Sequence, residues 1–524
     1  MTKPTHNSTE RHNIALVGAG VFAHNLSKVF PSSDFQLKYV VDEFKQGEYL
    51  GAQIISAKQL DAAKDKGITK YIIAISTAQY RQAAIERLLK QDIASDKIFA
   101  VDDDPSIPIL QLIFSRCLNQ ARDFFVSPQC TDMYALEQHC FGDTWQQALG
   151  NLDPNKATLA FGFYGRGGGF RRHLGGLVEP LKNKYNLLTL MDEEFNGDNF
   201  GLTKLYMGPS SAKQLEQIDA CITAHFIECS PSNKPKLNIL HTSFDFILEP
   251  QWIQDRLDSA DPHFIFASTR ATFQWMQELI EQQQTKNRIC LIPGGYTRLD
   301  DNLKHADSYQ GPIDSIIYAP TLSLNAVQHH QLTYSSPHGV TIIRSLLANF
   351  PDKTIIFRPH PNDLKMLKDG RNDELAQPFI DILSLCEQEP RLRLDGQQTF
   401  YMDSYNASAV MISDTSSTAY TYALSTLRPV IFFSAKDEQV REVFLKRSAF
   451  IRDREQIGKV VNNCQQMVEQ IQAMLANTQQ WQQQIANYRQ QVCFNLGHSE
   501  QYLLDNIDYL LSNKRHPEWL YYNW

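Results

Sequence analysis

Three features are scarce in this sequence of 524 residues: closely spaced cysteines, long apolar runs and an excess of positive charge. The nine cysteines include no C-x-x-C pair, which argues against a zinc ribbon or a dense disulfide framework and favours reduced thiols. No run approaches the roughly 20 apolar residues that a membrane span needs, and residues 1–13 lack the apolar core of a signal peptide. These absences predict a cytoplasmic protein.

The charge balance argues against a further class of protein. Lys and Arg number 50 against 58 Asp and Glu, which gives a formal net charge of -8. Broad nucleic-acid binding needs a basic surface, so we expect no nucleic-acid partner. No carboxylate pair or histidine cluster has metal-ligand spacing, so no protein metal site is predicted, although Mg²⁺ carried by a phosphorylated substrate is compatible with the sequence.

The first hundred residues have the pattern of a small Rossmann-like domain. A strand-like run over 13–17 leads into a G-x-G-x-x-A turn with Gly18 and Gly20, and Asp42 ends the next strand 22 residues after Gly20. This pattern is typical of a nucleotide or nucleotide-sugar site, but a turn that only packs a helix on a strand gives the same pattern. The segment is similar to domains of sugar O-acyltransferases and sugar C-methyltransferases, which implies binding or scaffolding rather than NAD chemistry.

A second possible anion site follows the strand predicted over 158–163. The segment 165–173 is rich in glycine and arginine, and backbone N–H groups and guanidinium groups together suit an anion. A flexible loop with a solvated basic face is the alternative, and His173 is either a base on this loop or simply exposed. The candidate phosphate-loop residues are Arg166, Gly167, Gly168, Arg171 and His173.

Three short β-branched runs in the second half each end in polar residues. Such runs, alternating with helical patterns, predict buried parallel strands. Ligands bind beyond the carboxyl ends of parallel strands, so we expect the polar residues to share one crevice. Asp414 is predicted to cap the following helix or to bind substrate. The runs and their polar ends are 315–319 with Thr321, 354–357 with Arg358-Pro359-His360-Pro361, and 409–412 with Ser413-Asp414-Thr415-Ser416-Ser417.

From about residue 157 onward the chain resembles the CDP-glycerol glycerophosphotransferases, the teichoic-acid polymerase group. Leu240-His241-Thr242-Ser243 falls where that family carries its presumed catalytic base, although Thr242 replaces a glycine. The resemblance implies a GT-B fold, in which two Rossmann-like domains face a cleft. The other matching motifs are Gly295-Tyr296-Thr297-Arg298-Leu299-Asp300, Tyr318-Ala319-Pro320-Thr321, Arg358 to Pro361, Ser413 to Ser417, and Arg428 to Phe433.

The resemblance also implies a reaction: transfer of glycerol- or ribitol-phosphate from a CDP-activated donor to an acceptor hydroxyl in surface-polysaccharide biosynthesis. His241 and His360 are then the predicted catalytic residues. Two alternatives stay open, a GT-B glycosyltransferase that uses a nucleotide sugar and a non-catalytic nucleotide-binding scaffold. Arg358 is either a phosphate clamp or an ion-pair partner, and Arg298 either binds donor or pins a linker. The predicted donor-binding residues are Arg298, Thr321, Arg358, Asp414, Thr415, Ser416 and Ser417.

The expected architecture is therefore α/β, a GT-B pair preceded by a small Rossmann-like domain. A saccharide or lipid-linked acceptor is expected, with peripheral membrane contact as an option. The three- and four-residue spacing of apolar side chains over 453–492 predicts one long amphipathic helix. The aromatic end, 519–524, either docks on the first half or touches a membrane surface. The predicted domains are 1–105 (Rossmann-like), 106–150 (helical connector), 151–308 (acceptor half) and 309–524 (donor half).

Overall fold

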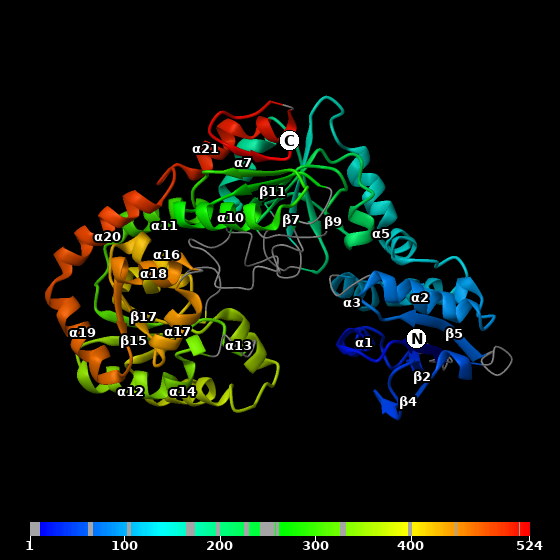
Figure 1. The fold of residues 1–524 in the computed structure, drawn as a ribbon, viewed down its shortest axis with the longest axis horizontal. Helices are drawn as coiled ribbons and strands as arrows, with labels where there is room; N and C mark the ends of the chain where they lie inside the picture. The colour runs from blue at the N-terminus through cyan, green and yellow to red at the C-terminus, as the bar shows by residue number, and fades with distance from the viewer. Residues whose placement is uncertain are drawn as a thin grey trace, which may run out of the picture. The chain divides into compact units, whose positions relative to one another are not determined.

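The chain folds into two compact units, residues 1–171 with 178–236, and residues 172–177 with 237–524. Each contains parallel β-sheet covered by helices (Figure 1). The computed structural model describes residues 11–60, 67–101, 106–163, 173–194, 200–224, 230–240, 257, 261–324, 332–396, 401–445, 448–512 and 514–524.

The N-terminal part forms the small Rossmann-like domain that the sequence predicts. Over its described residues the sheet has six strands in the order β3-β4-β2-β1-β5-β6. Its strands are parallel except for β3, which is antiparallel to β4. The elements are β1 (His12–Val17), α1 (Val21–Ser27), β2 (Phe35–Val41), β3 (Glu48–Tyr49), β4 (Ala52–Ile55), β5 (Ile68–Ile73), α2 (Ala78–Leu89) and β6 (Ile98–Ala100).

Three helices follow where the connector is predicted: α3 (Ile107–Arg116), α4 (Leu118–Val126) and α5 (Met133–Gly150). The last of them is bonded to the strand β9 (Thr203–Tyr206) and to the turn after it. The indole of Trp145 donates to the carbonyl of Tyr206 at 2.9 Å. The buried carboxylate of Glu137 accepts from the backbone N–H of Gly208 at 2.7 Å. A buried hydrogen bond to a charged group holds its partners firmly, so α5 is an integral part of the first unit.

Over the described residues the second sheet has eight strands, in the order β20-β13-β12-β11-β10-β7-β8-β9. Strand β20 pairs antiparallel with β13, whereas β12 and β13 are parallel, as are β7 and β8. The remaining elements are β7 (Thr158–Phe163), α7 (Gly175–Lys182), β8 (Asn186–Met191), α8 (Pro209–Ala212), β10 (Ala220–Thr223), β11 (Lys236–Ile239), β12 (His263–Phe266), α10 (Arg270–Gln283), β13 (Ile289–Ile292), α11 (Thr297–Ser308) and β20 (Leu520–Tyr522).

The third sheet is parallel, in the order β16-β15-β14-β17-β18-β19 for the strands that the structure describes. Both of its faces are buried. Ile316 and Tyr318 pack with α12 and α14, whereas Ile317 packs with α16 and α18. The two pairs of helices cover opposite faces of the sheet (Figure 1). The elements are β14 (Ser315–Tyr318), α12 (Gly339–Asn349), β15 (Thr354–Phe357), α13 (Pro361–Lys368), α14 (Gln377–Gln388), β16 (Leu392–Leu394), α15 (Met402–Ala407), β17 (Ser408–Ser413), α16 (Thr418–Thr426), β18 (Val430–Phe433), α17 (Asp437–Phe444), α18 (Ala449–Ile457) and β19 (Gly458–Val461).

The prediction of one long helix over 453–492 is wrong. Helix α18 ends at Ile457, β19 follows, and two further helices, α19 (Cys464–Ala476) and α20 (Thr478–Val492), complete the segment. The cause is Gly458, which pairs with Val430 so closely that a Cβ there would lie 1.9 Å from the Val430 carbonyl oxygen. Glycine permits such an approach and weakens a helix, and the β-branched pair after it suits a strand.

The aromatic C-terminus docks on the protein, after α21 (Ser499–Asn506) and α22 (Asp508–Leu511). Strand β20 extends the edge of β13, and the ring of Trp524 lies 5.1 Å from that of Phe264 and 5.6 Å from the guanidinium of Arg288. Of the two options left by the sequence, docking on the protein is therefore the one observed. Within the described part of the chain, no helix has the length and apolar character to cross a bilayer.

The contact at Gly458 gives a first test. We expect Gly458→Ala to lower the free energy of unfolding by about 2 kcal/mol, because the added methyl group must push β19 away from β18. Urea unfolding of the full chain, followed by circular dichroism, measures the change. Gly396→Ala is the matched control, since among the described residues its Cβ would meet Leu364 at an ordinary 3.5 Å. Equal unfolding midpoints for the two variants would contradict this explanation of the strand within residues 453–492.

Candidate functional site

The three polar strand ends predicted to converge do lie together. Strand β14 pairs in parallel with β15 on one side and with β17 on the other, so the three carboxyl ends meet at one edge of the sheet. Thr321 follows β14, Arg358 follows β15, and the serine-rich turn follows β17. The convergence predicted from the sequence is therefore confirmed for these three segments.

Asp414 joins two of these strand ends. One carboxylate oxygen accepts from the backbone N–H of Thr321 at 2.9 Å, and the other accepts from the N–H and hydroxyl of Ser335, each at 2.8 Å. Burial raises the pKa of Asp414, and these hydrogen bonds oppose that rise. The predicted helix-capping role is wrong, because Ser417 stands at the N-cap of α16. Both oxygens of Asp414 are engaged in holding loops together.

The serine-rich turn presents hydroxyl groups at the start of α16. The hydroxyl of Thr415 donates to that of Thr333 at 2.9 Å, and the hydroxyl of Ser416 accepts from the N–H of Thr418 at 3.4 Å. Ser417 is partly exposed. Because α16 has nine residues and begins here, its positive end faces this edge of the sheet.

His360 has a defined orientation and a defined tautomer. It is the N-cap of α13, and its Nδ1 accepts from the backbone N–H of Asn362 at 3.2 Å. In a neutral ring the proton therefore sits on Nε2. A buried residue of the same helix, Asp363, accepts from the N–H groups of Ser323 and Leu324, both at 3.0 Å. Asp363, which the sequence analysis missed, fixes the loop after β14 against α13.

The two predicted arginines lie around a tyrosine that the sequence analysis did not single out. Nε of Arg298 donates to the hydroxyl of Tyr401 at 3.0 Å. Arg358 forms an ion pair with Asp395 at 2.7 Å, and both side chains are about 90% buried. Arg358 is thus an ion-pair partner, one of its two predicted roles; neither contact tests whether the arginines also bind a donor. No local pattern marks Tyr401 or Asp395 in the sequence.

The acid at the end of the 295–300 motif has structural partners. The carboxylate of Asp300 accepts from the hydroxyl of Ser499 and from the N–H of Glu500, each at 3.1 Å. These bonds join α11 to α21. Asp300 therefore has a structural role in the packing of these two helices.

The first half of the predicted cleft is described only in part. His241, the predicted base, and Arg166, Gly167, Gly168 and Arg171 of the predicted phosphate loop lie outside the described residues. His173 is described and is buried, with its carbonyl accepting from the hydroxyl of Thr297 at 2.9 Å. The alternative of an exposed loop histidine is therefore wrong.

Helix α7 begins just after the predicted phosphate loop, and a carboxylate occupies its start. Glu500, from α21, accepts a hydrogen bond from the backbone N–H of Gly176. Burial and the nearby carboxylates of Asp301 and Asp300 raise the pKa of Glu500 to about 7, although Lys304 and the Gly176 bond oppose the rise. At this helix end the chain supplies its own carboxyl group as a hydrogen-bond acceptor.

The glycine turn of the N-terminal sheet is held by its own neighbours. Gly18 has a φ of +108°, which favours glycine, and its Cβ would lie 2.8 Å from the carbonyl oxygen of Ala74. Asp42 accepts from the backbone N–H groups of Ala19, Phe44 and Lys45 at 2.9 to 3.0 Å. The hydroxyl of Tyr49 donates to the carbonyl of Gly20 at 2.7 Å. These contacts fit the packing interpretation of the turn, and a nucleotide site there stays a prediction.

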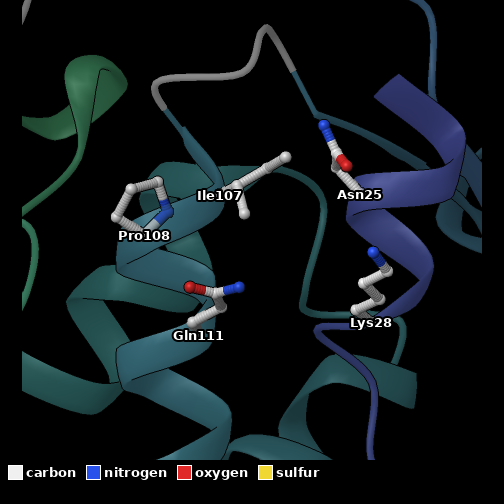
Figure 2. Close-up of a pocket in the computed structure, with 5 residues that line it drawn as sticks. All are labelled: Asn25, Lys28, Ile107, Pro108 and Gln111. Atoms are coloured by element: carbon white, nitrogen blue, oxygen red, sulfur yellow. The ribbon is translucent and has the colours of Figure 1, made fainter. Parts of the chain in front are cut away.

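None of these residues lines either of two surface hollows. One, of about 340 Å³, lies between α1 and the start of α3 and is lined by Asn25, Lys28, Ile107, Pro108 and Gln111 (Figure 2). The other, of about 460 Å³, lies along β19 and the start of α19. Among the described residues no group of three or more His, Cys, Asp or Glu is placed to hold a metal ion. Mg²⁺ arriving with a donor stays an untested expectation.

Comparison with known proteins identifies a family that the second half of the chain resembles. Residues 285–509 match the family model of CDP-Glycerol:Poly(glycerophosphate) glycerophosphotransferase, a range that contains all three converging strand ends. Over this range the chain is similar to the CDP-glycerol glycerophosphotransferases. The protein is thus a CDP-glycerol glycerophosphotransferase-like transferase, and the resemblance found in the sequence motifs is confirmed. No curated protein matches the chain.

Solved structures support the fold of this glycerophosphotransferase-like chain. The wall teichoic acid polymerase TagF matches with a TM-score of 0.50 and 14% identity, covering 76% of this chain and 97% of that one. A TagF variant matches with the same TM-score and 13% identity over the same shares. Identity this low bears on the fold alone, and it confirms the predicted fold class: a GT-B pair preceded by a Rossmann-like sheet.

The bonds of Asp414 give a second test. We expect Asp414→Asn to lower the free energy of unfolding by about 1–3 kcal/mol, because the amide must turn a donor toward another donor. Urea unfolding measures the loss. Asp403→Asn is the matched control, since Asp403 is exposed on α15, and its effect should stay within about 0.5 kcal/mol. A variant at Asp414 as stable as this control would show that the bonds are dispensable.

The raised pKa of Glu500 gives a third test, on pH. The folded-state pKa is about 7 and the ordinary value is 4.5, so the folded chain binds this proton more tightly than the unfolded chain. The resulting stability is full below about pH 4.5 and is lost as the pH rises through about 7. We expect Glu500→Gln to match the parent Tm near pH 4 and to exceed it near pH 8. Thermal unfolding checks this, and a Tm difference independent of pH would refute it.

Proposed function

We propose that this chain transfers a polyol phosphate, either glycerol- or ribitol-phosphate, from a CDP-activated donor to an acceptor hydroxyl in the synthesis of a surface polysaccharide. The observation that carries the proposal is the family match over residues 285–509, because it spans the strand ends that bring Arg358, His360 and Ser417 to one edge of the third sheet. The chemistry of these residues suits a diphosphate donor.

The reaction has a simple balance. The acceptor oxygen attacks the phosphorus that carries the polyol, and a new P–O bond forms. The bond from that phosphorus to the bridging oxygen of the diphosphate breaks, and CMP leaves with the electron pair. The proton of the acceptor hydroxyl passes to a base, for which His241 is the candidate that the family resemblance supplies. Catalysis of this kind rests on positioning the groups and on stabilising charge on phosphate oxygens.

The tautomer of His360 favours a role as a hydrogen-bond donor to phosphate over a role as the catalytic base. Since Nδ1 accepts from the N–H of Asn362, the neutral ring carries its proton on Nε2. That nitrogen can donate to a phosphate oxygen but cannot also accept the proton of the acceptor. We therefore assign His360 the role of a donor to the diphosphate, and the role of base goes to another group.

Further positive charge comes from three sources around this edge. Arg298 and Arg358 supply guanidinium groups, and the start of α16 supplies a helix dipole together with the hydroxyl of Ser417. Asp414, by contrast, is already engaged by backbone and hydroxyl donors. We therefore assign donor binding to the arginines, the histidine and the helix end, with Asp414 as the group that holds their loops.

The acceptor is the least constrained part of the proposal. A saccharide or a lipid-linked saccharide fits the resemblance, and the second would bring the chain to the inner face of a membrane as a peripheral protein. A nucleotide sugar in place of the CDP-alcohol is the competing donor, since a diphosphate is common to both. The first experiment therefore concerns the donor.

We expect the full chain to release CMP from CDP-glycerol or CDP-ribitol in the presence of a polyol-phosphate primer, and to release no nucleotide from UDP-sugars. His360→Asn should lower kcat by about 100-fold or more, because it removes the proposed donor to phosphate. Asparagine is itself a favoured N-cap, so α13 is retained. Nucleotide release, followed by chromatography, measures both effects.

His305→Ala is the control, because His305 is exposed on α11 and should leave kcat unchanged. Turnover of UDP-sugars without turnover of either CDP-alcohol would replace the proposal with the glycosyltransferase alternative. A His360→Asn variant with parental kcat would remove His360 from the mechanism. Nucleotide binding without any turnover would favour the scaffold alternative.

A further inference from the structure

Two arginines from separate motifs converge on one aromatic ring. The guanidinium carbon of Arg298 lies 5.0 Å from the ring centroid of Tyr401, and that of Arg358 lies 5.6 Å from the same centroid. Arg298 belongs to α11 and Arg358 follows β15, so they are 60 residues apart in the sequence. Each distance is within the range of a cation–π contact. Tyr401 thus connects the two motifs in space.

The hydroxyl of Tyr401 is fixed as well as its ring. It accepts from Nε of Arg298 at 3.0 Å and donates to the side-chain carbonyl of Asn302 at 3.1 Å. The amide of Asn302 donates in turn to the hydroxyl of Ser425 on α16 at 3.0 Å. Tyr401 is 9% exposed and Asn302 is fully buried, so this chain of bonds is shielded from water. Shielded hydrogen bonds in a chain support one another and lock orientation.

Arg358 is held from its other side. Its ion pair with Asp395 is supported by the hydroxyl of Ser404, which donates to the same carboxylate oxygen at 2.6 Å. Ser404 lies on α15, and Tyr401 stands at the N-cap of that helix. The short helix α15 therefore contributes to the placement of both arginines, through Tyr401 for the first and through Tyr401 and Ser404 for the second.

The nitrogen atoms of Arg298 have different roles in these contacts. Nε of Arg298 is bonded to the tyrosine, and its loose contact with Asp301 is 3.6 Å long. A guanidinium has five N–H donors, so holding it by Nε fixes its plane while the terminal nitrogens keep capacity for a planar anion. The two positive guanidinium groups repel each other, and the electron-rich ring of Tyr401 offsets part of that repulsion.

We propose that Tyr401 is a positioning residue that sets the planes of Arg298 and Arg358 so that both can bind the diphosphate of a nucleotide donor. The proposal rests on the function proposed above, since it takes that diphosphate as the ligand. Tyr401 does not touch the reacting atoms. It acts through the two arginines, so its effect is on donor affinity rather than on the chemical step.

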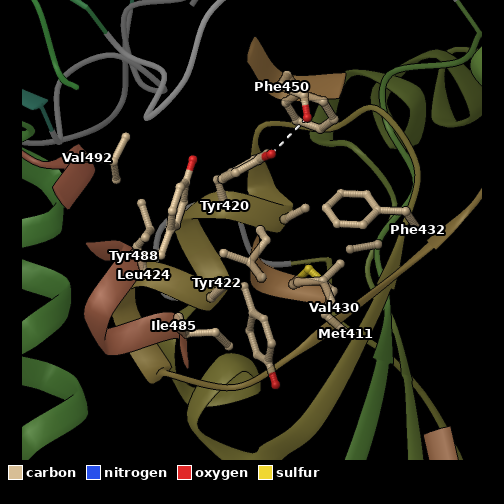
Figure 3. Packing of buried hydrophobic residues seen from close by; sticks show 14 of the residues in the cluster. Met411, Tyr420, Tyr422, Leu424, Val430, Phe432, Phe450, Ile485, Tyr488 and Val492 are labelled. Carbon is tan, nitrogen blue, oxygen red and sulfur yellow. Dashed lines mark hydrogen bonds between the residues drawn. The ribbon is translucent and has the colours of Figure 1, made fainter. Parts of the chain in front are cut away.

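The test compares two tyrosines of the second unit in the full chain. Tyr401→Phe keeps the ring but removes the bonds to Arg298 and Asn302. Tyr420→Phe is the matched control: Tyr420 is fully buried, and its hydroxyl donates to the carbonyl of Phe450 at 2.8 Å (Figure 3). Calorimetric titration with CDP and with UDP measures the affinity of each variant, kinetics with CDP-glycerol give KM and kcat, and thermal unfolding gives Tm.

We expect Tyr401→Phe to weaken the binding of whichever nucleoside diphosphate, CDP or UDP, the parent binds better by about 10-fold. KM for CDP-glycerol should rise by a similar factor, and kcat should stay within about 3-fold of the parent value. Tyr420→Phe should lower Tm about as much as Tyr401→Phe does, without changing the affinity for either diphosphate or KM for CDP-glycerol. A Tyr401→Phe protein that binds both diphosphates as the parent does overturns the proposal. So does a loss of kcat at unchanged KM.

The outcome also separates this inference from the proposed function. A parent chain that binds CDP or UDP but releases no CMP from CDP-alcohols would defeat the proposed function. The positioning role would then be decided by the affinity ratio between Tyr401→Phe and the parent. A parent chain that binds neither CDP nor UDP overturns the positioning role itself, because the arginines would then have no diphosphate to bind.

Discussion

Two buried aspartates hold the loops of the candidate site in place. Asp414 ties the loop after β14 to the segment at Ser335, and Asp363 ties the same loop to α13. Each carboxylate is surrounded by donors from the chain itself, which compensates for the loss of water around a charge. The positive groups, Arg358 and His360, thereby stand on segments with a fixed relation to one another.

The buried strands could be predicted from the sequence, whereas several short strands could not. Runs such as 354–357 are β-branched and apolar throughout because both faces of the third sheet are covered, so the signal is local. Strands β16 and β19 lie at the sheet edges, and pairing rather than composition defines them. At β19 the spacing of Ile457, Val460 and Val461 imitates a helix, and only the close approach of Gly458 to β18 reveals the strand.

Some residues of the candidate site could likewise be predicted from the sequence, whereas others could not. Arg358, His360 and the serine-rich turn were predictable because they follow buried strands directly and match family motifs. Tyr401 and Asp395 were not, because their importance comes only from contacts with distant residues. The family motif also suggested substrate binding for Asp414, an acid whose local sequence is the same whether it binds a ligand or a neighbouring loop. The burial of Asp414 and its hydrogen bonds to two loops are not visible in a sequence.

The central claim is that a diphosphate donor binds at the shared edge of β14, β15 and β17 in the third sheet. Hydrogen exchange followed by mass spectrometry, with and without CDP-glycerol, tests it most directly. The account predicts slower exchange in peptides that cover residues 319–323, 358–363 and 414–418, with no change around the glycine turn at 18–20. Slower exchange at that turn, with the third sheet unaffected, would contradict it.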